Sequence, residues 1–202
     1  MEDMKRRGNV IFLTATALVL VTLSLNSPWL GLTQTLTVKD ISGLPVVSNN
    51  HWGLHMDYYT VNSNPSSGYG QKNALARLMS LEQDVMLSWL VLGLAFLGLT
   101  LVNSRWLCII VGLIMVGAMA LAVAVFAMNV AGAVNDSNAN GGLPWFPHLD
   151  NFFGSTNWYD IGVLSWGPTS GWFLALGAGV MQAVALLLGA TRALSGRGLW
   201  KE

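Results

Sequence analysis

The residues best suited to binding a metal ion lie in two polar segments of the chain. His51, His55 and Asp57 alternate along one segment, and His148 and Asp150 lie in the other. Residues two apart on an extended strand lie on the same face, separated by about 7 Å along the strand. Imidazole and carboxylate groups together are suitable ligands for zinc or copper. No spacing brings the two segments together, and surface histidines more often make ordinary hydrogen bonds. We therefore predict no cofactor, with these five residues as the alternative of a metal- or ligand-binding subunit of a membrane enzyme.

The long apolar stretches contain no residue that could carry a proton or coordinate an ion. They lack Asp, Glu, Lys, Arg and His, and their most polar residues are Asn129 and Gln182. Ion-coupled transport and intramembrane catalysis need ionisable groups, whereas amides inside a bundle commonly form hydrogen bonds between helices. No catalytic triad, phosphate loop or haem motif is present, and the single cysteine, Cys108, excludes an internal disulfide. The sequence predicts a protein that is not an enzyme.

Four apolar stretches are long enough, or nearly so, to cross a bilayer, which takes about 20 residues as a helix. They cover residues 10–30, 85–102, 106–134 and 171–191. Only 10% of the chain is charged and 53% is hydrophobic, whereas soluble domains carry about 25% charged residues. The sequence predicts an integral membrane, mainly α protein, with a four-transmembrane-helix bundle and a small extracellular antiparallel β-sheet in one domain, 1–202.

Basic residues predict the orientation of these spans. Both termini and the short 103–105 connection hold seven basic residues, whereas the outer segments between the spans hold three, Lys39, Lys72 and Arg77. Cytoplasmic segments carry the excess of Lys and Arg, so we expect both termini in the cytoplasm and a multi-pass protein of the plasma membrane. Tryptophans at the outer ends of the spans are expected to act as interfacial anchors; these are Trp29, Trp166 and Trp172.

The outer loops 31–73 and 135–165 show the period of two that is typical of strands. Strands are expected at 32–38, weakly at 44–47, at 52–61 and within 158–166, with a turn at 48–50 and a helix N-cap at Asn73. One face of the third strand is apolar, and we expect its aromatic packing to hold the sheet in place of a disulfide; this face comprises Trp52, Leu54, Met56 and Tyr58.

This layout resembles the claudin-like tetraspan membrane proteins over nearly the whole chain. Trp29 and the Gly53-Leu54 pair match part of the family's Trp and Gly-Leu-Trp pattern, with His55 in place of the second Trp. Residues 74–78 resemble the Ala- and Arg-rich start of the second claudin helix, while the two claudin cysteines are absent. The resemblance implies a left-handed bundle carrying an extracellular sheet, and a role in adhesion, barriers or accessory-subunit work.

These patterns predict a protein that acts by protein–protein contacts within the lipid bilayer. We expect it to assemble with itself or with other membrane-protein subunits, as an adhesion or barrier component or an accessory subunit. Balanced charge gives no sign of nucleic-acid binding. A channel-forming oligomer with an acidic outer vestibule is a further alternative. The expected interface combines the apolar sheet face with small residues that allow close helix approach; it comprises Trp52, Leu54, Met56, Tyr58, Gly179 and Ala183.

Overall fold

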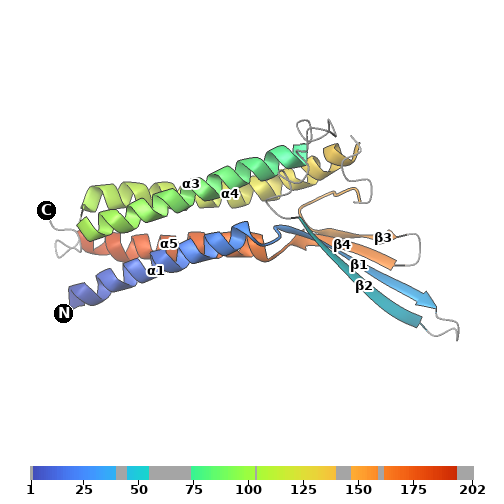
Figure 1. The fold of residues 1–202 in the computed structure, drawn as a ribbon, viewed down its shortest axis with the longest axis horizontal. Helices are drawn as coiled ribbons and strands as arrows, with labels where there is room; N and C mark the ends of the chain where they lie inside the picture. Colours follow the sequence, from blue (N-terminus) through green and yellow to red (C-terminus); the bar gives the residue numbers. More distant parts are fainter. Residues whose placement is uncertain are drawn as a thin grey trace. The chain divides into compact units, whose positions relative to one another are not determined.

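The computed structural model describes residues 2–39, 45–54, 74–102, 104–139, 147–158 and 162–194. It is mainly helical, with one antiparallel four-stranded sheet (Figure 1). The helices are α1 (Glu2–Leu25), α3 (Ala74–Val102), α4 (Arg105–Ala139) and α5 (Ser170–Leu194). All four contain a segment long and apolar enough to span a membrane, which indicates a multi-pass membrane protein and fits a tetraspan arrangement.

The chain forms two compact units. The first combines residues 1–25, 84–124 and 173–202, and the second combines residues 26–83 and 125–172. Helices α3, α4 and α5 each contribute residues to both units. The first unit is a helical bundle, and the second contains the sheet.

Helix α1 ends at Leu25, so the expectation that it continues to residue 30 is wrong. Pro28 explains the difference, because proline disfavours helical conformation in the residue before it and has no N–H for the helix ladder. Leu30 begins strand β1 instead, and Trp29 and Leu30 are both fully buried. Trp29 is therefore a core residue and not an interfacial anchor.

Helix α3 begins at Ala74, directly after the N-cap predicted at Asn73 and eleven residues before the apolar stretch 85–102. Its second residue, Leu75, donates its backbone N–H to the Ser137 hydroxyl of α4 at 3.2 Å. A helix start leaves N–H groups without intrahelical partners, and Ser137 satisfies one of them from a neighbouring helix. The predicted cap, Asn73, lies outside the described residues. Arg77, Glu82 and Asp84 consequently belong to the first three turns of the helix.

Helix α4 has 35 residues, which corresponds to about 52 Å at 1.5 Å per residue. This length exceeds the hydrocarbon core of a bilayer, about 30 Å thick, as the uncharged run from 106 predicts. Helix α3 ends at Val102, shortly before α4 starts. Near this end, the Arg7 side chain of α1 donates to the carbonyl oxygens of Thr100, at 2.7 Å, and Leu101. A cation at a helix C-terminus satisfies carbonyl groups that lack intrahelical partners.

Glycines allow the helices of the first unit to approach closely. A Cβ atom at Gly93 would lie 2.6 Å from a methyl carbon of Leu18 and 3.3 Å from Met115. A Cβ atom at Gly112 would lie 2.7 Å from a methyl carbon of Leu186. In lipid, close packing of this kind supplies much of the energy of helix association. The indole N–H of Trp89 adds a hydrogen bond to the Met115 carbonyl, at 2.9 Å.

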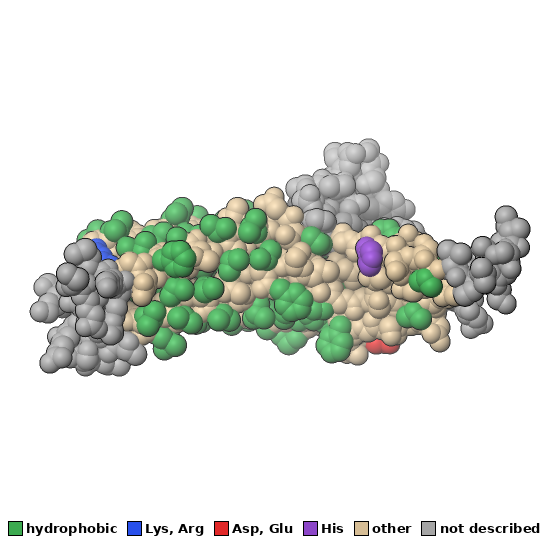
Figure 2. All heavy atoms as spheres, turned by 90° about the horizontal axis from the view of Figure 1, so that it is seen from below, with side chains coloured by type: hydrophobic (Ala, Val, Ile, Leu, Met, Phe, Trp, Pro, Cys, Tyr) green, Lys and Arg blue, Asp and Glu red, His purple; other side chains and the backbone are tan. Residues whose placement is uncertain are grey.

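The outward faces of the helices are apolar, and Figure 2 shows many hydrophobic side chains on the surface of one side of the molecule. Soluble proteins rarely expose so much contiguous apolar surface, whereas a bilayer covers it at no cost. The most exposed of these side chains include Phe12 of α1, Val91 and Leu94 of α3, Leu121 and Met128 of α4, and Leu187 of α5.

The sheet has the strand order β2-β1-β4-β3, all antiparallel. The strands are β1 (Leu30–Lys39), β2 (Pro45–Leu54), β3 (Gly154–Trp158) and β4 (Gly162–Pro168). The predicted turn at 48–50 is wrong, because these residues pair with β1 inside a continuous β2. The single strand expected within 158–166 is a hairpin of two strands. Backbone pairing along β1 outweighs the local turn preference of Ser48, Asn49 and Asn50.

Candidate functional site

The sheet has one apolar face, and one row of it contains two tryptophans. In this row Trp52 of β2 and Trp166 of β4 both pair with Leu32 of β1. Leu32 is 2% exposed and Trp166 is 7% exposed, whereas Trp52 is 40% exposed. The apolar row is therefore covered at its centre and open at the β2 side, where Trp52 ends it.

A hydrogen bond fixes the Trp166 ring in place, and a glycine on the neighbouring strand leaves room for it. Its indole N–H donates to the Asn151 carbonyl at 3.0 Å. Its paired residue on β3 is Gly154, and a Cβ atom there would lie 2.7 Å from the ring. Trp166 is thus a structural residue and not an interfacial anchor, which leaves Trp52 as the exposed aromatic of the described apolar face. Leu54 is the backbone register partner of Leu30, and Met56 and Tyr58 lie outside the described residues.

The opposite face of the sheet is polar and contains one of the predicted metal ligands. His51 pairs with Thr33, and its Nδ1 lies 3.0 Å from the Thr33 hydroxyl. His55 and Asp57 lie outside the described residues. The described partner of His51 is therefore an ordinary cross-strand hydroxyl.

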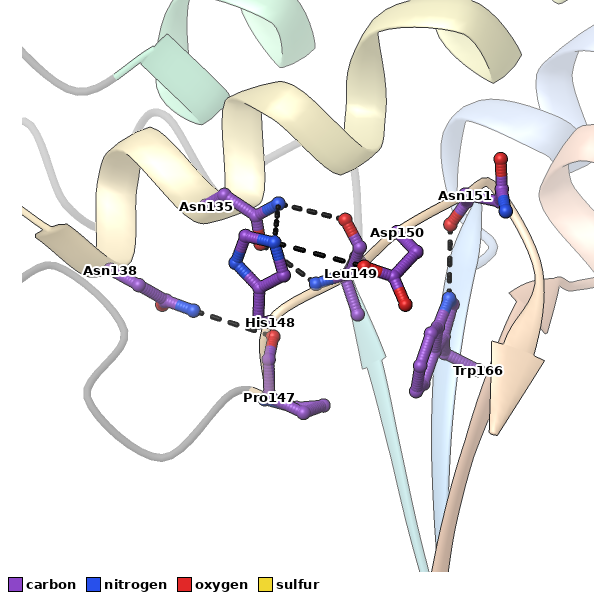
Figure 3. A network of polar contacts seen from close by, with 8 residues as sticks. All are labelled: Asn135, Asn138, Pro147, His148, Leu149, Asp150, Asn151 and Trp166. Atoms are coloured by element: carbon purple, nitrogen blue, oxygen red, sulfur yellow. Dashed lines mark hydrogen bonds and ion pairs between the residues drawn. The ribbon is translucent and has the colours of Figure 1, made fainter. Parts of the chain in front are cut away.

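The second predicted pair lies in a polar network beside the end of α4 (Figure 3). The Asn135 side chain donates to the Leu149 carbonyl at 2.7 Å and accepts from the Leu149 N–H at 2.8 Å. His148 Nε2 lies 3.8 Å from Asp150 Oδ1 and 3.5 Å from Asn135 Nδ2, with His148 and Asp150 mostly exposed. Among the described residues no three His, Cys, Asp or Glu side chains group as a metal site would require. The network fixes the segment 147–149 onto the end of α4.

A cluster of four aromatic residues forms part of the core of the second unit. Trp29 contacts Phe126 of α4 edge to face, with ring centroids 5.1 Å apart, and Phe126 contacts Phe152 at 6.0 Å. Phe152 in turn lies 5.4 Å from Trp172 of α5. Aromatic pairs in this geometry contribute beyond their buried area. The cluster joins the segment before β1 to two helices of the same unit.

A groove of about 520 Å³ lies between the first turns of α3 and the second half of α4. Arg77 and Asn129 are its polar lining residues, and the Asn129 amide N–H donates to the Val125 carbonyl of its own helix at 2.7 Å. This bond within one helix corrects the expectation that Asn129 links two helices. The remaining lining is apolar or small: Ala74, Leu78, Leu81, Val125, Met128, Gly132 and Ala133.

Glu82 is a buried carboxylate that lies between the predicted outer loop 31–73 and the predicted apolar span 85–102. It is 1% exposed, and its Oε2 has no hydrogen-bond partner among the described residues. A signal was present, because Glu82 continues a stripe of apolar residues at spacings of four and three along α3. The other members of the stripe are Leu75, Met79, Met86 and Trp89, all buried. The early start of α3 carries Glu82 into this buried face.

The small residues of α5 serve packing within the chain. A Cβ atom at Gly179 would lie 2.8 Å from Met119 Cγ of α4, and Ala183 is half-buried. A contact of Gly179 or Ala183 with a second chain stays a prediction. Gln182, between them, is fully buried, and neither its amide oxygen nor its nitrogen has a partner among the described residues. The expected hydrogen bond from Gln182 to another helix is therefore not formed within this part of the chain.

Comparisons of the chain with known protein families, curated proteins and solved structures find no match.

Proposed function

We propose that this protein acts by contacts with copies of itself or with other membrane proteins, and performs no chemistry of its own. The observation that carries the proposal is Trp52, which is 40% exposed at the open end of an otherwise buried apolar row. Exposed tryptophan is enriched at protein interfaces, where one residue can supply much of the binding energy.

The position of Trp52 in the sheet adds a second means of contact. Strand β2 is the first strand in the sheet order and pairs only with β1 among the described strands. An edge strand presents backbone N–H and C=O groups to which a strand of another chain can pair. Backbone pairing along β2 together with burial of Trp52 would give a partner both affinity and register.

Within this proposal the chain is a claudin-like tetraspan protein of the plasma membrane, with an extracellular sheet and no disulfide. It works as a self-assembling adhesion or barrier component, or as an accessory subunit of a larger membrane complex. Support comes from four apolar helices of spanning length combined with a small antiparallel sheet.

Cross-linking from the apolar face of β2 tests this function. The photo-reactive residue p-benzoylphenylalanine is placed at Trp52, or at Asn49, which is exposed on the opposite face of the same strand. Irradiation of intact cells is expected to give an adduct with a second polypeptide from position 52 and little from position 49. Mass spectrometry then identifies the partner as the same chain or another. No adduct from position 52, or equal adducts from both positions, would contradict the proposal.

Cysteine labelling tests the proposed orientation. Single cysteines are placed at Ser48, Ala139 and Ser195 in a Cys108→Ser background; Ser48 and Ala139 are exposed, whereas nearby Ser137 is buried and unsuitable. With both termini in the cytoplasm, an impermeant maleimide is expected to label positions 48 and 139 on intact cells. Position 195 should react only after the cells are permeabilised. The reverse pattern would invert the topology.

A further inference from the structure

The groove between α3 and α4 changes in polarity along its length. The two helices run antiparallel here, because Leu75 near the start of α3 contacts Ser137 near the end of α4. One end of the groove therefore combines Arg77 with small residues, Ala74 and Gly132, and the other end combines Leu81 with Val125 and Met128. The second end lies further along α3 in the direction of its long apolar run, which continues to Val102.

We propose that this groove binds a phospholipid with an anionic headgroup, its phosphate at Arg77 and an acyl chain along Leu81, Val125 and Met128. A guanidinium group binds phosphate through paired, charge-assisted hydrogen bonds. Leu81 and Met128 are 54% and 72% exposed, so the apolar end is open for an acyl chain to enter from the side. A volume of about 520 Å³ lies within the range of small-molecule sites, about 300 to 1,000 Å³.

The direction of this gradient favours a lipid over a soluble anion or a peptide. A membrane lipid holds its headgroup at the bilayer surface and its chain inside, and the groove presents its cation and its apolar walls in that same order. A free phosphate would leave the apolar end unused. The proposal rests on membrane insertion of α3 and α4, and it is independent of the protein contacts proposed for the sheet.

Gly132 supplies the means to close the groove without touching the core. It lines the groove, it is exposed, and no atom lies within 4 Å of the position that a Cβ would take. Gly117 on the same helix has equally open space and does not line the groove. Leucine at position 132 would fill the groove, whereas leucine at position 117 provides a control of the same size on the same helix.

Native mass spectrometry of the full chain in mild detergent measures the binding. Phosphatidylglycerol and phosphatidylcholine of the same acyl chains are added separately, and the fraction of protein carrying one lipid is measured. The unaltered protein is expected to favour phosphatidylglycerol. Arg77→Gln should weaken that binding about tenfold, the effect of losing one hydrogen bond to a charged group. Gly132→Leu should weaken it at least as much, and Gly117→Leu should leave it unchanged.

Several outcomes would overturn the proposal. Equal binding of the two lipids removes the role of the anionic headgroup. Loss of binding in Arg77→Gln but not in Gly132→Leu would mean that Arg77 attracts the headgroup at the protein surface and that the groove does not hold the lipid. Equal losses in Gly132→Leu and Gly117→Leu would mean a general effect of leucine on the helix. Circular dichroism of each variant confirms folding, and Gly132→Ala, a smaller change, replaces Gly132→Leu if that variant fails to fold.

Discussion

Replacing Trp29 by alanine is expected to lower the free energy of unfolding by about 3 to 5 kcal/mol, the usual range for a large buried aromatic. Trp29 is fully buried and contacts Phe126 edge to face at 5.1 Å. Its backbone carbonyl also accepts a hydrogen bond from the Thr169 N–H at 3.2 Å. Because whole domains are commonly stable by only about 5 to 15 kcal/mol, this single change removes a large share of the total.

Trp52→Ala is the matched control for this prediction. Trp52 is the same residue type but is 40% exposed, so its truncation leaves a smaller cavity and is expected to cost clearly less. Unfolding in mixed micelles of increasing denaturing detergent, followed by far-ultraviolet circular dichroism, measures both variants. A loss in Trp52→Ala equal to or larger than that in Trp29→Ala would mean that the sheet face, and not the aromatic cluster, holds the fold.

Gly171→Ala is expected to destabilise the protein by about 1 to 3 kcal/mol, the usual cost of overfilling a packed site. A Cβ atom at Gly171 would lie 2.7 Å from the carbonyl oxygens of both Ser27 and Pro28, and it would collide with the Trp29 ring. Backbone oxygens cannot turn aside as a flexible side chain can. The Gly171 N–H also donates to the Pro28 carbonyl at 2.8 Å, and the added methyl group would push this pair apart.

Gly117→Ala, in contrast, is expected to stabilise the protein. Gly117 lies inside α4 with no atom within 4 Å of a Cβ position. Alanine there removes conformational freedom from the unfolded chain and is expected to add about 0.5 to 1 kcal/mol of stability. The same detergent titration compares the two variants. If Gly171→Ala and Gly117→Ala change the free energy of unfolding by the same amount and in the same direction, the close backbone approach at Gly171 does not explain the effect of alanine there.

The candidate sites differ in how far the sequence could predict them. The apolar sheet face could be predicted in part, because alternation places Trp52 on it and Leu32 on the partner strand. Alternation does not say which strand lies at an edge, so it could not distinguish the exposed Trp52 from the buried Trp166. The groove could not be predicted, because Arg77 and Gly132 are separated by more than fifty residues and no pattern in the sequence indicates that they lie together.

The sequence by itself determined the four apolar helices, the antiparallel strands and the shortage of charge. These depend on local composition and period, since a bilayer requires about 20 apolar residues per helix and a strand alternates its faces. The break after α1 was also encoded locally, by Pro28, although the apolar run through Trp29 and Leu30 concealed it.

Only the tertiary structure decided which side chains are buried. The N-cap predicted at Asn73 agrees with the start of α3 at Ala74, but only the structure shows that Ser137 of another helix accepts the Leu75 N–H there. That early start carries Glu82 onto the buried stripe. Likewise, the pairing of β1 with both β2 and β4 covers Leu32 and leaves Trp52 open. Burial depends on neighbours that are distant in the chain, and hydrophobicity along the sequence does not contain them.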